Sequence, residues 1–276
     1  IDNLPQYGRW DYGPQKWMMN HLKIRYDRSK GLFDRMKINL ARQDFKESRI
    51  TRNYQSEIER TRKEELIAYS FNADVIKRLT KKTKLYYGAE YIYNNIDSEG
   101  NIRILSNSVE QPTSSRYPDA QWQSIGVYHS IEHVFNNYFN LTAGLRWNAV
   151  KINAEFDTRA FDLPFEETNL DNSALSGSLG LNYKTNKGFR IFGRVSNAFR
   201  APNVDDIGKI FDSEPGRLVV PNPDLDAEYA WNMEFGLTYM WNKKLKVQLN
   251  SYWTWLDNAM VRRNYQLGDR DSVLYD

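Results

Sequence analysis

The residues that could carry chemistry are few, and their spacing favours neither a catalytic nor a metal site. The chain has 276 residues, three histidines and no cysteine, which excludes disulfides, thiol nucleophiles and cysteine-based zinc sites. His129 and His133 have a spacing that brings two metal ligands together on a helix. Their segment has strand periodicity, in which four residues span about 13 Å. We therefore expect no catalytic residue, no metal and no cofactor.

The most informative polar segment is a proline-rich loop that begins after Phe199 and ends near Tyr229. Its charged side chains are the candidate ligand-binding residues: Arg200, Asp205, Asp206, Lys209, Asp212 and Arg217. Two interpretations are open. The loop either binds a ligand at the outer end of the structure, or its prolines make it a structural cover that binds nothing.

Charge and hydropathy exclude two broad classes of protein. The 38 basic and 35 acidic residues nearly balance, and no basic face is evident, so no nucleic-acid partner is expected. The charged run 60–65 is interpreted as a solvated loop. Mean hydropathy is −0.72, and no apolar run approaches the ~18 residues of a membrane-spanning helix. Neither value argues against barrel strands, which alternate polar and apolar residues.

An alternation of period two runs through most of the chain. In Tyr138–Trp147 every second residue is apolar and the intervening ones are polar or small, which predicts a strand with two different faces. Aromatic residues make up 14% of the chain and gather near strand ends, as in the girdles of membrane barrels. About ten strands are predicted, at 17–26, 33–47, 61–77, 83–96, 119–135, 138–153, 174–184, 189–199, 228–241 and 244–258.

The connections between these strands alternate between short and long. The short ones are Asp27–Gly31, Thr80–Lys82, Asn136–Asn137, Thr185–Gly188 and Asn242–Lys243, and the long ones lie near 48–60, 97–118, 154–173 and 200–227, with another beginning near 259. Outer-membrane barrels have short periplasmic turns and long extracellular loops in this order. The predicted fold is all-β: an antiparallel transmembrane barrel of up-and-down hairpins, either closed or present as an open curved sheet.

Two short motifs add a resemblance. Phe199-Arg200-Ala201-Pro202, followed by Asn222-Pro223-Asp224-Leu225 and Glu228, resembles the paired FRAP and NPxL-x-x-E signatures of TonB-dependent outer-membrane receptors. The early segments 10–18, 44–49 and 85–91 are similar to barrel strands of Bacteroidetes-type members. The resemblance covers the whole chain. It implies that residues 1–276 are about ten strands of a 22-strand receptor barrel, with the plug and the C-terminal strands absent.

The resemblance also implies a function. Such receptors, in the bacterial outer membrane, take up a scarce nutrient such as a ferric siderophore, haem, cobalamin or a glycan. Their partners are membrane lipid, the receptor's own plug, the small nutrient and the TonB–ExbB–ExbD complex that supplies energy. Haem receptors of the family carry a histidine between the two motifs. None lies between Pro202 and Asn222, so the resemblance does not support haem specificity. The expectation is a receptor for iron or a cobalamin-type ligand, and not an enzyme.

Three alternatives remain open from the sequence. The chain could be a complete ten-stranded outer-membrane barrel such as a protease, a glycan-uptake receptor, or a soluble carbohydrate-binding sheet protein. The protease requires His and Asp groups that converge at one end of the barrel. The sheet protein requires no membrane.

Overall fold

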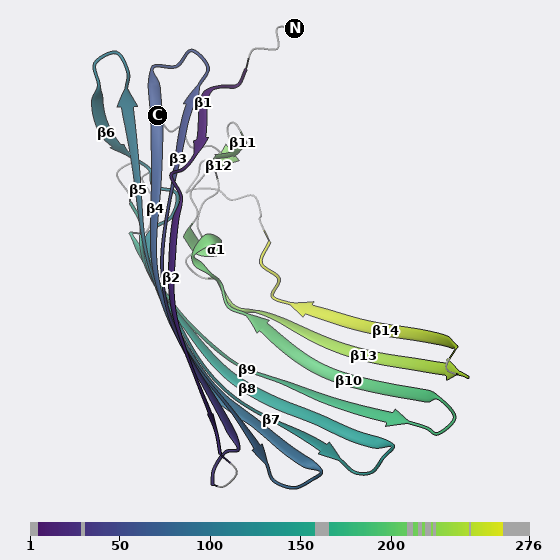
Figure 1. Cartoon of the computed structure of the whole chain (residues 1–276). Coiled ribbons are helices and arrows are strands. Elements are labelled where there is room, and N and C mark those ends of the chain that lie inside the picture. The colour runs from purple at the N-terminus through teal and green to yellow at the C-terminus, as the bar shows by residue number, and fades with distance from the viewer. Residues whose placement is uncertain are drawn as a thin grey trace.

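In the computed structural model the chain forms one large, strongly curved sheet with a small helix on its concave side, and a separate pair of short strands (Figure 1). The structure describes residues 5–28, 31–157, 166–208, 212–214, 217–218, 222, 225–242 and 244–261. The strands are β1 (Tyr7–Tyr12), β2 (Lys16–Asp27), β3 (Arg35–Asn53), β4 (Ile58–Arg78), β5 (Thr83–Ile104), β6 (Val109–Thr113), β7 (Asp119–Val134), β8 (Phe139–Glu155), β9 (Glu167–Lys184), β10 (Phe189–Arg200), β11 (Asp212–Glu214), β12 (Arg217–Leu218), β13 (Glu228–Trp241) and β14 (Leu245–Asp257); the helix is α1 (Val204–Gly208).

The main sheet has twelve strands, and its order follows the chain as β1-β3-β4-β5-β7-β8-β9-β10-β13-β14, with antiparallel pairs throughout. Two neighbours flank β3 on the same side, because β1 pairs with its outer part and β2 with its inner part. In the same way β5 pairs with both β6 and β7. Within the described residues the first and last strands of this order do not pair with each other, so the sheet is open and is not a closed ten-stranded barrel.

The ten predicted strands are all present, and the strand ends that the five short connections join lie along one edge of the sheet (Figure 1). The predicted long loops at 48–60 and 97–118 are wrong. β3 continues to Asn53 and β4 begins at Ile58, while β5 continues to Ile104 and turns back into β6. Both faces of these extensions are polar, so the alternation disappears from the sequence. Backbone pairing does not need that contrast and continues.

The run 60–65, interpreted as a solvated loop, is therefore part of β4. The predicted loop at 154–173 is shorter than expected, since β8 extends to Glu155 and β9 begins at Glu167. The bounds of the predicted connection at 200–227 are confirmed, because β10 ends at Arg200 and β13 begins at Glu228. Residues 158–165 within the first of these loops are outside the described part of the chain.

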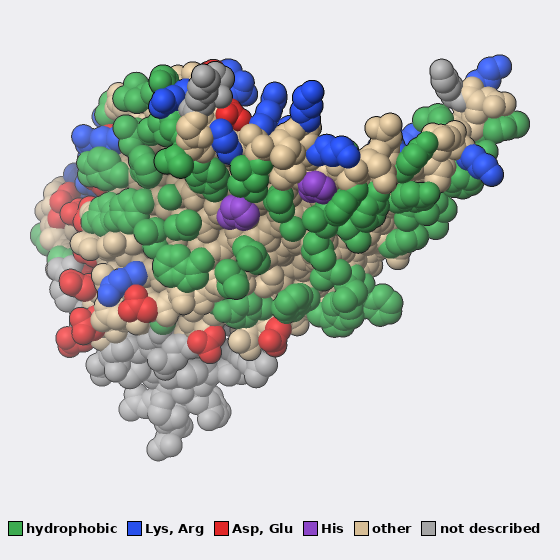
Figure 2. All heavy atoms as spheres, turned by 90° about the horizontal axis from the view of Figure 1, so that it is seen from below, with side chains coloured by type: hydrophobic (Ala, Val, Ile, Leu, Met, Phe, Trp, Pro, Cys, Tyr) green, Lys and Arg blue, Asp and Glu red, His purple; other side chains and the backbone are tan. Residues whose placement is uncertain are grey.

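The convex face of the sheet carries an exposed apolar band. Large side chains on it are strongly exposed, for example Leu145 and Leu175 at 60% and Leu249 at 62%. On β4 the band runs from Ile67 to Val75, about 27 Å along the strand, close to the ~25 Å band of outer-membrane barrels. Figure 2 shows hydrophobic side chains spread over the sheet, with basic groups along one margin and acidic groups toward the opposite one.

The concave face is polar and internally hydrogen bonded. Arg146 Nη2 donates to Glu90 Oε1 at 2.8 Å, and Asn148 Nδ2 donates to Ser124 Oγ at 3.0 Å. These side chains come from β5, β7 and β8 and share one face by the strand register. The sheet therefore separates an apolar exterior from a polar interior, as the sequence predicts.

The two faces should respond differently to a new charge. Leu145→Lys places an ammonium at the middle of the convex band and should cost about 2–4 kcal/mol of stability in a bilayer. Ser178→Lys, at the same depth on the concave face, is the control and should cost little. Refolding into lipid vesicles, followed by heat-modifiable gel mobility, measures both. Equal loss for the two variants would contradict the assignment of the faces.

Candidate ligand-binding site on the concave face

The loop after β10 turns back and packs α1 onto the concave face of the sheet. Ile207 is fully buried and Val204 is 7% exposed, and both pack against Ile152 of β8 together with Ala120 and Ala154. The helix begins at a capping box, in which Asn203 and Asp206 each accept a hydrogen bond from the other's backbone amide. This small apolar contact fixes one wall of the site described below.

Arg200 ties the loop to the sheet. Its Nη2 lies 2.7 and 2.6 Å from the two carboxylate oxygens of Asp206, and its Nη1 lies 3.0 Å from Glu228 Oε2. Glu228 also accepts a hydrogen bond from the Met260 amide. That amide, followed by the Arg200 guanidinium, holds the pKa of Glu228 below its ordinary value. The two sequence motifs thus meet through the Arg200–Glu228 ion pair.

The predicted ligand-binding residues fall into two groups: those with described side-chain partners and those whose side chains are not described. Arg200 and Asp206 bind each other, and Asp205 accepts a hydrogen bond from Tyr117 Oη at 3.0 Å. The backbones of Asp212 and Arg217 lie on the β11–β12 hairpin, but their side chains are outside the described part, as is Lys209. The binding role assigned to these residues stays a prediction.

Several other residues of the two motifs are packed against the helix or the sheet. Ala201 and Leu225 pack against the α1 core, and Pro202 is fully buried. The rings of Phe199 and Tyr229 lie 6.4 Å apart, centroid to centroid, on the convex face. Asn222 is described and exposed, whereas Pro223 and Asp224 lie outside the described residues.

Between α1 and the sheet lies a hollow of about 600 Å³, here called the mouth pocket. Its walls come from β3, β4, β5, β7, the 114–118 linker between β6 and β7, and α1. The lining residues are Phe45, Glu47, Arg49, Glu64, Glu65, Leu66, Asn94, Ile96, Arg116, Tyr117, Trp122, Asn203, Val204 and Asp205. Apolar and aromatic side chains and charged ones contribute equally to this lining, and small-molecule sites combine apolar surface with polar groups that orient the ligand.

The charged end of the mouth pocket is built around two carboxyl groups. Arg49 and Arg116 both donate to Glu47 Oε1 at 3.1 Å. Glu64 lies directly across from Glu47 in the strand register and is 6% exposed. Neither of its carboxyl oxygens has a hydrogen-bond partner in the described structure. Burial raises the pKa of Glu64, which lies on β4 beyond the apolar band.

The aromatic side of the pocket is equally enclosed. Burial and the hydrogen bond to Asp205 raise the pKa of Tyr117 to about 12, so its hydroxyl remains a donor at neutral pH. The Arg116 guanidinium lies 4.8 Å from the centre of the Tyr117 ring, within the range of a cation–π contact. The linker is thus held by Arg116, which pairs with Glu47 of β3, and by Tyr117, which donates to Asp205 of α1.

Sequence reasoning missed the pocket residues Glu47, Glu64, Arg116, Tyr117 and Trp122. Glu47 and Glu64 are 17 positions apart in the sequence and meet only through the β3–β4 register. One signal was available: the charged residues Glu47 and Arg49 follow Phe45 at every second position of β3. Recognising it requires knowing that the strands do not stop there.

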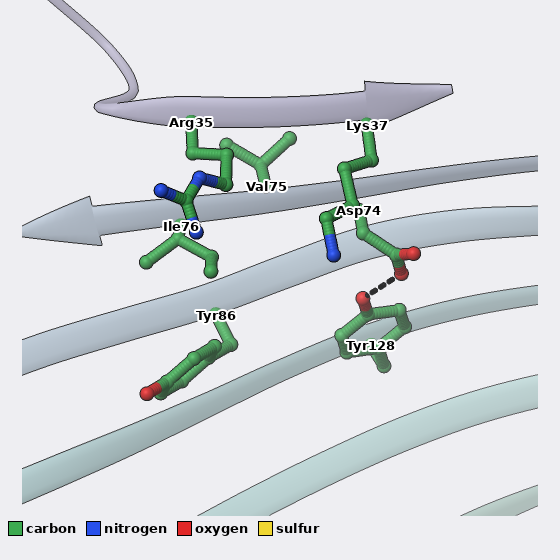
Figure 3. Close-up of a pocket in the computed structure, with 7 residues that line it drawn as sticks. All are labelled: Arg35, Lys37, Asp74, Val75, Ile76, Tyr86 and Tyr128. Atoms are coloured by element: carbon green, nitrogen blue, oxygen red, sulfur yellow. Dashed lines mark hydrogen bonds between the residues drawn. The ribbon is translucent and has the colours of Figure 1, made fainter. Parts of the chain in front are cut away.

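A second hollow of about 200 Å³ lies on the concave face nearer the short turns (Figure 3). There Tyr128 Oη donates to Asp74 Oδ1 at 2.5 Å, beside Lys37 and Tyr86. The Tyr128 ring lies over Gly88, where a Cβ would come within 2.6 Å of it. This hollow is a gap between wall side chains and is much smaller than the mouth pocket.

The histidines do not form a site in the described structure. His133 Nδ1 lies 2.8 Å from Thr83 Oγ1 on the convex face, near a short turn. Among the described residues no group of His, Cys, Asp or Glu has the arrangement of a metal site. The same part of the chain holds no helix of the length and apolarity needed to cross a membrane.

The Arg200 ion pairs can be tested by loosening α1. Arg200→Ala removes three short contacts to carboxylates on a half-exposed side chain, and should cost about 1–2 kcal/mol of local stability. Hydrogen exchange at the α1 amides should then speed up roughly tenfold. Arg194→Ala, which removes a 3.9 Å pair with Glu234 on the same two strands, is the control. Unchanged exchange in Arg200→Ala would show that the apolar contacts alone hold the helix.

Comparison with known proteins places this geometry in a family. Residues 2–272 match the model of TonB-dependent receptor-like β-barrels. A segment of 128 residues is 30% identical to haemoglobin–haptoglobin utilization protein B of Neisseria meningitidis serogroup C, covering 45% of this chain and 15% of that protein.

Solved structures show the same fold at low identity. The copper transporter OprC superposes with a TM-score of 0.73 at 13% identity, over 91% of this chain and 40% of that one. The ferric yersiniabactin uptake receptor FyuA from Yersinia pestis superposes with a TM-score of 0.59 at 13% identity, over 87% of this chain and 35% of that one. A double mutant of the Serratia marcescens hemophore receptor HasR, in complex with HasA and heme, superposes with a TM-score of 0.64 at 13% identity. The match covers 89% of this chain and 40% of that one.

The chain spans about two fifths or less of the length of these structures and a smaller share of the curated relative. These matches do not bear on the Bacteroidetes-type subgroup. With the family model covering nearly all residues, the chain belongs to the TonB-dependent receptors and forms part of their β-barrel.

Proposed function

We propose that this chain is part of the wall of an outer-membrane receptor that takes up a small iron-containing nutrient, with a ferric siderophore as the substrate class. The observation that carries the proposal is the mouth pocket, where α1 closes over the polar concave face. A nutrient entering from the outer end of the barrel would meet this pocket on its way inward.

The names of similar proteins support the choice of iron. Several structural neighbours are named for iron uptake, among them the ferric yersiniabactin uptake receptor FyuA and the FrpB iron transporter of Neisseria meningitidis. The partial curated relative is named for haemoglobin–haptoglobin use. The mouth pocket adds aromatic and guanidinium groups that suit a bulky, polar chelate.

The partners follow from the proposed architecture. The convex apolar band would contact membrane lipid, and the polar concave face would contact the plug of the complete receptor. Energy would come from the TonB–ExbB–ExbD complex acting on that plug. None of these partners requires a catalytic group, and transport without chemistry is the proposed activity.

Growth on defined iron sources tests the proposal. A strain without the gene for the receptor that contains this chain should fail to grow on a particular ferric siderophore under iron limitation, and the wild-type gene should restore growth. Trp122→Ala in the mouth pocket should reduce uptake of radioactive iron roughly tenfold, as loss of an aromatic contact residue does.

Trp147→Ala is the matched control, because Trp147 is on the convex face of the neighbouring strand. It should leave uptake near the wild-type value while both variants reach the membrane in equal amounts. Growth of the deletion strain on every ferric siderophore supplied would refute iron-siderophore uptake.

A further inference from the structure

The unusual group on the concave face is the carboxyl of Glu64. It is more than nine-tenths buried, it lines the mouth pocket, and neither oxygen has a hydrogen-bond partner in the described structure. A buried carboxyl without donors is destabilising, because it has lost water and gained nothing in return. Such a group in a pocket wall is typical of a site that awaits a donor from outside.

The surrounding charges point to the kind of donor. Glu47 holds two guanidinium groups, those of Arg49 and Arg116, while Glu64 directly beside it holds none within hydrogen-bonding distance. The guanidinium groups of Arg116, Arg49 and Arg62 are near enough to act on Glu64 electrostatically, but none of them donates a hydrogen bond to it. Glu64 is therefore a pocket carboxyl without a hydrogen-bonded cation.

Access to Glu64 is compatible with the fold. Arg116 lies on the 114–118 linker, which is not part of a strand, so its side chain can turn aside without breaking strand pairing. Glu47 would keep Arg49 as its partner. The rings of Tyr117 and Trp122 also line the pocket, and aromatic faces attract cations.

We infer that Glu64 is the acceptor of a subsite in the mouth pocket for a cationic nitrogen group, an ammonium or a guanidinium, carried by the nutrient ligand. The inference rests on the proposed function in that a ligand enters the pocket. It goes further by naming the chemistry of one end of that ligand and the residue that binds it. A neutral ligand of the same shape would leave Glu64 without a charged partner.

The subsite can be tested without knowing the nutrient. N-methylguanidinium and N-methylurea have nearly the same shape but differ in charge. Binding of each to the purified full-length receptor in detergent is measured by saturation-transfer NMR at their methyl signals. Wild-type receptor should bind methylguanidinium saturably, and methylurea at least about tenfold more weakly, because a charge-assisted contact is lost.

Two glutamate-to-glutamine variants isolate the role of Glu64. Glu64→Gln should weaken methylguanidinium binding about tenfold. Glu90→Gln removes a concave-face carboxyl that pairs with Arg146 and does not line the mouth pocket, so it should leave binding unchanged. Glu64→Asp keeps the charge on a shorter side chain and should bind with intermediate strength. Heat-modifiable gel mobility confirms that each variant is folded.

Three results would overturn the inference: no saturable binding by the wild type, equal binding by Glu64→Gln, or equal binding of methylurea. The first includes the case in which a side chain from elsewhere in the receptor already occupies Glu64. These outcomes are independent of the growth assay. A receptor that transports no ferric siderophore can still bind the probe, and a siderophore receptor can fail to bind it.

Discussion

The constraint on which the structure depends is the pairing of every strand's backbone amides and carbonyls with its neighbours. If the apolar convex face lies in lipid, as proposed, no water is available there to satisfy open backbone groups, so the strands must be long, antiparallel and in register. That register then decides the chemistry of both faces. It aligns the polar residues of β5, β7 and β8 on the concave side and places Glu47 opposite Glu64. The side chains that line the mouth pocket are therefore brought together by the register of the paired strands.

The sequence predicts the strands whose two faces differ in polarity. The ten main strands and the short turns between them follow from alternation and from turn residues. The outer ends of β3, β4 and β5 could not be predicted, because both of their faces meet polar surroundings. β1 and β6 were missed because each is a short strand that shares one side of its partner with another strand.

The candidate site shows a second limit. The charges of Arg200 and Asp206 are neutralised by each other and by Glu228, and this was not visible from residue types in a loop. Conversely, Glu64 looked like part of a solvated run, yet it is buried beneath the linker. Net charge in a segment says little about which charge is available, because partners come from strands distant in sequence. Register and burial supply that information.

The strands of the first half also determine what the outer end of the molecule is made of. β4 continues from Ile67 to Ile58, about 30 Å of strand beyond the apolar band, and its neighbours β3 and β5 continue with it (Figure 1). This rim is therefore a sheet with its amides paired, rather than a set of loops. A protease needs an extended segment that it can lift away from its neighbours, and a paired rim offers it very few. The wall can thus extend well beyond the apolar band and still resist cleavage.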